Sequence, residues 1–369
     1  MISVQLVSGD MAVGADGTVT HVDGSRVYAF GHRFLSVGAT ELPFTNASVI
    51  TLLPNLSTSF KISASGEWLG SITADYNAAV SGELGKRART APVTISVAGA
   101  DRQSKYRMEM VQDQLLSPLL LQMLLYSALD ASERTVGSSS VRLKGTVKFD
   151  GAPEPVRIDN MYSGDFNVPL VASLGAALPV AYALQNTVDT LRLQSVDLTV
   201  EAIPVKKQYS IENAWTSRRD VRPGESLEVS ALLVGDGGKE VVKQVTYEVP
   251  IGAPTGPLNI TVADGPTTNA SDGRVYTLAQ PRPASQVIPL LNSLRGSTKG
   301  YVRFWRQDPT YTLEGQDLPH PPPSVGMILA RLPNATPATA RTSTVAEVAF
   351  DADNAVISGS KTIQVEVKE

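Results

Sequence analysis

Short runs in which hydrophobic and polar residues alternate make up most of the chain, and Gly, Asp and Asn residues separate them. Over residues 1 to about 112, the runs include Ser48–Leu53, Gly70–Ala74 and Pro92–Val97. This pattern is typical of short antiparallel strands joined by turns. Leu191–Ile203 alternates strictly and is predicted to be a long strand whose one face is buried. The sequence therefore predicts a mainly β protein that begins with an antiparallel barrel or sandwich.

The segment Gly17–Phe34, GTVTHVDGSRVYAFGHRF, predicts a β-hairpin. Its two runs, Thr18–Val22 and Arg26–Phe30, are rich in β-branched and aromatic residues, which suit a half-buried pleated surface. Asp23-Gly24 between them is a turn signal of type I′. His32 follows the second strand directly, where a rigid sheet could aim its imidazole into a cleft.

Two apolar stretches predict helices. In Leu115–Leu129, leucine recurs at helical spacing, and Ser117 followed by Pro118 is a good N-cap and first-turn pair. One buried helix over about 114–133 is expected here. Val168–Leu184 is more apolar, but it is short for a membrane span and contains Pro169, Gly175 and Pro179. A buried helix or a strand–helix segment is favoured there over membrane contact.

The chain is long enough for two or three domains. We expect a first domain over residues 1–135 and a β-rich middle segment with an apolar helical insert over 136–205, with Gly137–Ser140 as the linker between them. Residues 206–369 have strands at sandwich-like spacing and predict an Ig-like β-sandwich. Its members include Ser226–Val234, Gln244–Val249, Leu258–Val262 and Thr362–Val367, with a helix expected over Ala284–Leu294 and a proline-rich connector over Pro319–Pro323.

Composition excludes several classes of function. With no cysteine, the 369 residues offer neither a disulfide framework nor a thiol nucleophile nor thiolate metal ligands. A net charge of −4, with no cluster of basic and aromatic residues, indicates that nucleic acid is not a partner. No glycine-rich nucleotide motif follows a strand, and the three histidines lack metal-ligand spacing, so neither a cofactor nor a metal is expected.

His32 is the first candidate for chemistry, although a histidine at the end of a strand is more often structural. His21 lies within a predicted strand as a surface residue, and His320 lies in the proline-rich connector. A catalytic histidine needs a nucleophile beside it and an orienting carboxylate behind it. Asp113, just before the Leu115–Leu129 helix, could fill the second role, but it is more often an N-cap at such a position. The chain contains no GxSxG motif.

The segment GTVTHVDGSRVYAFGH resembles the histidine-bearing strand pair of the SpoIVB-type serine peptidase family. AAVSGELG at Ala78–Gly85 and APVTISV at Ala91–Val97 follow in the order that this family shows, and QDQLL at Gln112–Leu116 resembles its aspartate segment. The resemblance covers roughly the first 135 residues. It implies that His32 is the general base and that Asp113 orients it.

The chain departs from the family at the nucleophile, because the GMSGSP motif that carries the family's serine is absent. Some exported bacterial relatives carry that motif upstream of the histidine segment. By this resemblance, the chain is expected to be the downstream part of such a protein, with its serine on an upstream segment and an extracytoplasmic or secreted location. MISVQLVSGD at the N-terminus is not itself a signal peptide.

Two hypotheses follow. The chain is a SpoIVB-type serine endopeptidase-like protein, inactive as given, which acts on a peptide or protein substrate. Alternatively, it is a non-catalytic extracytoplasmic β-sandwich protein that binds a peptide, a polysaccharide or a protein partner. Neither hypothesis includes a membrane span. The first predicts that His32 lies within hydrogen-bond reach of Asp113 at the edge of an open cleft.

Overall fold

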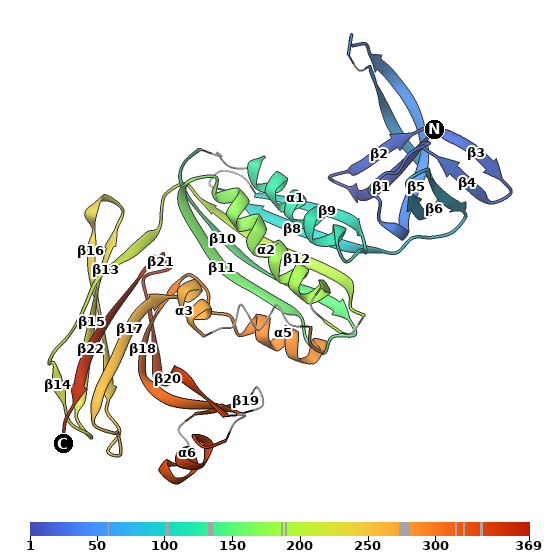
Figure 1. Ribbon diagram of the computed structural model, residues 1–369. Coiled ribbons are helices and arrows are strands. Elements are labelled where there is room, and N and C mark those ends of the chain that lie inside the picture. Colours follow the sequence, from blue (N-terminus) through green and yellow to red (C-terminus); the bar gives the residue numbers. More distant parts are fainter. Residues whose placement is uncertain are drawn as a thin grey trace. The chain divides into compact units, whose positions relative to one another are not determined.

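The computed structural model describes residues 1–57, 59–99, 103–131, 136–185, 187–188, 190–272, 281–313, 316–319, 322–332 and 335–369 (Figure 1). Strands dominate, so the prediction of a mainly β fold is confirmed. The chain forms two compact units. Unit 1 comprises Met1–Lys206 and Arg274–Leu294, and unit 2 comprises Lys207–Gly273 and Arg295–Glu369.

The first seven strands of unit 1 form a small barrel. The pairs run in the order β1-β5-β6-β7-β4-β3, and β2, which continues into β3 after one residue, pairs with β1 and closes the ring. Inward-facing residues such as Val4, Phe44 and Val80 are fully buried. The strands are β1 (Ile2–Gly9), β2 (Val13–Gly17), β3 (Val19–Asp23), β4 (Arg26–Ala29), β5 (Gly38–Leu53), β6 (Phe60–Tyr76) and β7 (Ala79–Leu84).

The predicted hairpin is present as β3 and β4, with the turn shifted by one residue. Asp23 pairs with Arg26, so the central residues of the turn are Gly24 and Ser25. Gly24 has φ of 57°, and glycine at the first central position is the pattern of a type II′ turn rather than type I′.

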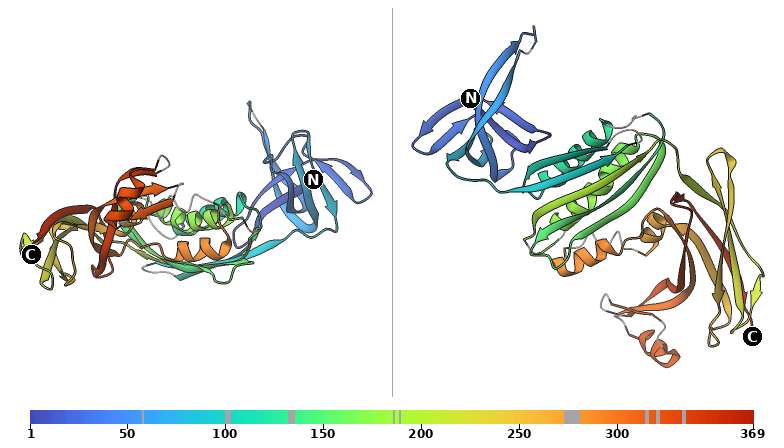
Figure 2. Two further views of the ribbon diagram at one scale, coloured as in Figure 1. Left: turned by 60° about the horizontal axis from the view of Figure 1, so that its bottom comes forward. Right: turned by 180° about the vertical axis from the view of Figure 1, so that it is seen from behind.

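The second part of unit 1 is a layer of five strands with helices packed on it. The strand order is β11-β10-β12-β8-β9, in which β12 runs parallel to β8. Helices α1 and α2 lie side by side on one face, and the view from behind shows the strands from their other face (Figure 2). The elements are β8 (Thr90–Ala98), β9 (Gln103–Val111), α1 (Leu116–Asp130), β10 (Val136–Asp150), β11 (Val156–Phe166), α2 (Val168–Gln185), β12 (Arg192–Ile203) and α5 (Ala284–Asn292).

Two sequence-based boundaries differ from this arrangement. Residue 135 was expected to separate two domains, but β8 and α1 before it pack with β12 and α2 after it in one core. The expected linker Gly137–Ser140 lies in β10, where Ser139 pairs with Gly164 and Ser140 is buried. The sequence of this segment is typical of a linker. It forms a strand because residues far away in the sequence pair with it and bury it.

Helix α2 is the one described helix that is long and apolar enough to cross a membrane by length and composition. Half of its most apolar window is buried within unit 1. It packs on α1 and on β10 and β11, which is the environment of a core helix. Pro179 lies inside it without ending it.

Unit 2 consists of two sheets around one core. The four-stranded sheet has the order β16-β15-β13-β21, and the six-stranded sheet has the order β14-β22-β17-β18-β19, with β20 on β18. Tyr247 of the first sheet stacks on Phe304 of the second, with ring centroids 3.9 Å apart. This facing of two sheets is a β-sandwich arrangement.

The four-stranded sheet is built from β13 (Gln208–Thr216), β15 (Ser226–Gly235), β16 (Glu240–Glu248) and β21 (Val356–Ser358). The six-stranded sheet is built from β14 (Asp220–Val221), β17 (Gly256–Asp264), β18 (Lys299–Leu313), β19 (Gln316–Pro319), β20 (Ala335–Asp351) and β22 (Ser360–Val367). A 3₁₀ turn (Asp236–Gly238), α3 (Gly265–Ser271) and α6 (Pro323–Leu329) connect strands.

Candidate functional site

His32 lies in the loop Phe30–Val37, which connects β4 to β5 and is called the histidine loop below. Phe30, Gly31 and Ser36 have φ of 72°, 71° and 59°, in the left-handed region. For the two non-glycine residues this conformation costs about 1–3 kcal/mol each, and such strain persists only where surrounding contacts enforce it.

Asp75 of β6 provides the main enforcing contact. Its side chain is almost completely buried, and its carboxylate accepts hydrogen bonds from three backbone N–H groups of the histidine loop. The donors are Phe34 (2.8 Å), Leu35 (2.6 Å) and Val37 (3.3 Å). Charge-assisted bonds of this kind contribute about 1.5–3 kcal/mol each, so Asp75 holds the loop in one conformation.

The Phe30 ring fixes the other end of the loop. It lies so close to Gly17 that a Cβ atom on that residue would be 1.9 Å from Phe30 Cδ1. It also makes an edge-to-face contact with Phe34, with centroids 5.7 Å apart. Glycine at position 17 is therefore needed for the loop to close on the barrel.

The His32 side chain itself is exposed. Its Nδ1 lies 2.6 Å from the Arg33 carbonyl oxygen, and its ring is 5.8 Å from that of Phe30. Because a carbonyl oxygen only accepts, the bonded Nδ1 carries the proton in neutral imidazole, and Nε2 keeps the basic lone pair. The loop therefore presents a histidine in the tautomer that a general base needs.

Asp113, the second predicted site residue, caps helix α1. Its Oδ1 accepts from the N–H groups of Leu115 and Leu116, both at 2.8 Å. Its own N–H donates to Ser117 Oγ at 3.0 Å, and Ser117 Oγ in turn donates to the Val111 carbonyl. The expected N-cap role of Ser117 is therefore wrong: the helix begins at Leu116, and Asp113 satisfies its first N–H groups.

The structure does not join the two predicted site residues. Among the described residues, no hydrogen bond or ion pair links His32 to Asp113, and each has other partners. The carboxylate that holds the histidine loop is Asp75, whose sequence context predicts a turn residue but which lies within β6. One signal was available, since Asp75 directly follows the alternating run Gly70–Ala74, which predicts a strand.

Asp113 instead lies at a pocket of about 410 Å³ in unit 1. Gln112 in its wall donates from Nε2 to the carbonyls of Thr90 (3.2 Å) and Leu193 (2.7 Å), while its Oε1 is buried without a partner. Arg89 pairs with Glu41 at 2.9 Å. The other lining residues are Ala39, Thr40, Gln114, Ser117, Leu184, Thr190, Leu191 and Arg192. The pocket thus offers both donors and acceptors to a polar ligand.

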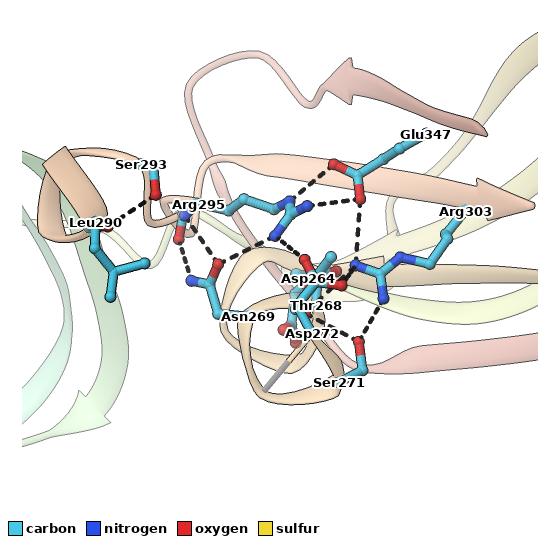
Figure 3. Close-up of polar contacts among 10 residues, drawn as sticks. All are labelled: Asp264, Thr268, Asn269, Ser271, Asp272, Leu290, Ser293, Arg295, Arg303 and Glu347. Carbon is cyan, nitrogen blue, oxygen red and sulfur yellow. Dashed lines mark hydrogen bonds and ion pairs between the residues drawn. The ribbon is translucent and has the colours of Figure 1, made fainter. Parts of the chain in front are cut away.

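Unit 2 contains a second polar centre, which we call the arginine cluster: Arg295, Arg303, Asp272 and Glu347 (Figure 3). Arg295 binds Glu347 through two bonds of 2.8 Å and Asp272 through one of 2.6 Å. Arg303, 6% exposed, binds the same two carboxylates at 2.6 and 3.2 Å. Each of the two cations binds both anions. These bonds connect the end of α3 to β18 and β20.

The electrostatics of the arginine cluster agree with a structural role. Burial alone would lower the pKa of the Arg295 guanidinium, but its hydrogen bonds and charge pairing with Glu347 and Asp272 outweigh burial and raise it. Burial raises the pKa of Tyr301, whose ring lies 5.4 Å from Arg295 Cζ. Both shifts favour the cationic arginine and the neutral tyrosine, so neither group is prepared for proton transfer.

The remaining histidines add no site. His21 is exposed on β3, with its ring 6.2 Å from that of Tyr28, and His320 lies outside the described residues. Within the described ranges, no group of three His, Asp or Glu side chains is placed to hold a metal ion. Comparisons of the chain with protein-family models, with curated proteins and with solved structures found no match.

Proposed function

We propose that the chain carries the histidine half of a SpoIVB-type serine peptidase active site and that a segment outside the given sequence supplies the serine. The observation that carries this proposal is the histidine loop, in which Asp75 binds the backbone of Phe34, Leu35 and Val37. The His32 imidazole is exposed, and its Nδ1 bonds to the Arg33 carbonyl. The resemblance of Gly17–His32 to the family's histidine segment supports the same role.

In this mechanism, His32 Nε2 removes the proton of the serine hydroxyl as the oxygen attacks the substrate carbonyl, and it later returns the proton to the leaving amine. The Arg33 carbonyl holds the ring in the required tautomer, which is the task that the resemblance assigned to Asp113. The substrate is a peptide or protein, and the location is extracytoplasmic. The chain alone is inactive, because GMSGSP is absent.

A serine-directed fluorophosphonate probe tests this proposal. The gene is expressed together with the coding sequence that precedes Met1, and labelling is compared in the original protein, His32→Ala and the matched control His21→Ala. Labelling that is lost in His32→Ala and kept in His21→Ala supports the proposal. Labelling that survives His32→Ala, or the absence of a serine-bearing segment from the longer product, contradicts it.

The pocket beside Asp113 favours a second candidate, a non-catalytic peptide-binding protein. Its specific observation is Gln112 Oε1, a buried acceptor with no donor among the described residues. The pocket is also lined by Arg192 and by Arg89, which pairs with Glu41. A peptide supplies both an N–H group and a carboxylate for these groups. Calorimetric titration with a library of short acidic peptides is expected to show binding that Gln112→Met weakens about tenfold, the effect of one unsatisfied polar group. If Gln112→Met binds the peptides as tightly as the original protein does, this pocket is not the peptide-binding site.

A further inference from the structure

The barrel of unit 1 extends into a two-stranded ribbon formed by the ends of β5 and β6. We call the described residues 49–57 and 59–62 the apolar arm. Figure 1 and both views of Figure 2 show these paired ends reaching away from the other strands of the barrel. In this part, β5 and β6 pair only with each other, from Val49 with Ser63 to Leu53 with Phe60.

Large hydrophobic side chains cover the arm and face outward. Leu56 at the tip is fully exposed, and Ile50 and Phe60 are 67% and 56% exposed. Four further large residues of the arm are exposed: Val49, Leu52, Leu53 and Ile62. Single exposed hydrophobic residues need no explanation, but a contiguous group of this kind marks an interaction surface.

The strand register places these residues on both faces of the ribbon. Directly opposed residues share a face, and successive pairs alternate between faces. Leu53 with Phe60 and Thr51 with Ile62 therefore occupy one face, while Leu52 with Lys61 occupies the other. A protein partner that covers one face would leave the second face in water, whereas a lipid environment surrounds the tip.

The charge pattern agrees with a lipid environment. From Asn46 to Gly66 the sequence contains no acidic residue, and Lys61 is its one charged residue. A lysine at the margin of an apolar surface can extend its ammonium group to lipid headgroups. The first acidic contact is at the base of the arm, where Ser63 Oγ donates to Asp16 at 2.5 Å.

We propose that the apolar arm inserts into the interfacial zone of a lipid bilayer and attaches the protein peripherally to a membrane surface. The four steps from Val49 to Leu53 span about 13 Å at about 3.3 Å per residue. That length suits an element which enters the headgroup–acyl boundary to a depth of about 5–10 Å. Asp16 at the base limits deeper insertion.

Co-sedimentation of the full chain with phosphatidylcholine vesicles tests this proposal. The double variant Leu53→Ser/Leu56→Ser is expected to reduce vesicle binding at least about tenfold, because it removes two of the inserted side chains. The matched control is Val242→Ser/Ile251→Ser, which replaces two exposed aliphatic residues of unit 2 and is expected to bind like the original protein. Circular dichroism checks that both variants fold.

A second measurement tests directly whether the tip of the apolar arm enters the bilayer. In Leu56→Trp, the added fluorescence is expected to shift to shorter wavelength on vesicles and to be quenched by brominated lipid, while Ile251→Trp shows neither effect. Equal vesicle binding by the arm variant and the control overturns the proposal. A second result would also overturn it: the original protein fails to bind vesicles and sediments as a dimer, while the double variant of the arm sediments as a monomer. The arm would then be an interface between two copies of the chain.

Discussion

The histidine loop of unit 1 and the arginine cluster of unit 2 are polar centres with opposite designs. In the cluster, Arg303 is buried and every carboxylate has two cationic neighbours. The charges of the cluster therefore pair with one another and hold α3 to the sheet. In the loop, as far as the described residues show, the buried carboxylate of Asp75 binds only backbone N–H groups, and the His32 imidazole is exposed with no partner on Nε2. A charge that is paired and buried holds structure, whereas a group held by backbone contacts and left exposed is available for chemistry.

Breaking the arginine cluster is expected to have the largest effect. Arg303→Ala leaves Asp272 and Glu347 with one cation between them in a partly buried site. Removing one partner of a fully buried ion pair costs about 3–5 kcal/mol, and we expect a loss near the lower end of that range because the two carboxylates are partly exposed. Urea unfolding of the full chain measures the loss. The exposed pair Arg218–Glu225 is the matched control, since Arg218→Ala removes a surface pair of about 0–1 kcal/mol. Equal losses in the two variants would show that the cluster is not structural.

Removing the anchor of the histidine loop is expected to have the next effect. Asp75→Ala leaves three backbone N–H groups without their acceptor. Because these loop residues are partly exposed and water can replace part of the lost acceptor, the total cost in the free energy of unfolding is expected to be about 2–3 kcal/mol, less than the sum of three such bonds. Hydrogen exchange at Phe34, Leu35 and Val37 is expected to accelerate, while exchange in unit 2 is unchanged. Unchanged protection at these three amides would mean that the loop is held by other contacts.

The third prediction tests whether Asp113 caps helix α1 or interacts with His32. Asp113→Ala is expected to lower the stability by about 1 kcal/mol, the usual value of an N-cap, because the first N–H groups of α1 lose their acceptor. The NMR signals of the His32 ring are expected to stay in place. A displacement of these signals would indicate that Asp113 does act on His32, as the family resemblance implies.

The smallest effect concerns an exposed pair in unit 1. The hydrogen bond from Lys206, at 2.5 Å, and a second one from Ser138 hold the pKa of Asp165 below its ordinary value. A carboxyl with a lowered folded pKa stabilises the fold above its unfolded pKa, and this stabilisation is lost as the pH falls through the folded pKa. Lys206→Met should therefore be slightly less stable than the original protein at pH 7. The difference should begin to shrink as the pH falls below the ordinary carboxyl pKa of 3.8, and it should vanish only below the lowered pKa of folded Asp165. If the two proteins still differ in stability below the folded pKa of Asp165, Lys206 has another role.

Much of the secondary structure could be predicted, because its causes are local. Strict alternation identified Leu191–Ile203, observed as β12, and leucine spacing identified the helix that is observed as α1. The segment Gly137–Ser140 was misjudged because serine and glycine carry little local preference, and the neighbouring strands β11 and β12 determine its conformation. The same limit applies to Ser117, whose hydroxyl finds its acceptor on Val111 of β9.

Local patterns along the chain are enough to predict a mainly β protein, a hairpin before His32 and the absence of the resembling family's serine motif. Periodicity, turn residues and motifs are local properties, so they can be read along the chain. That Asp75 rather than Asp113 supports the histidine loop could be seen only in the folded chain, because the three bonds of Asp75 join residues about forty positions apart. The tertiary structure also exposes the apolar residues around Leu56, because among the described residues the distal ends of β5 and β6 pair only with each other and no third strand covers them.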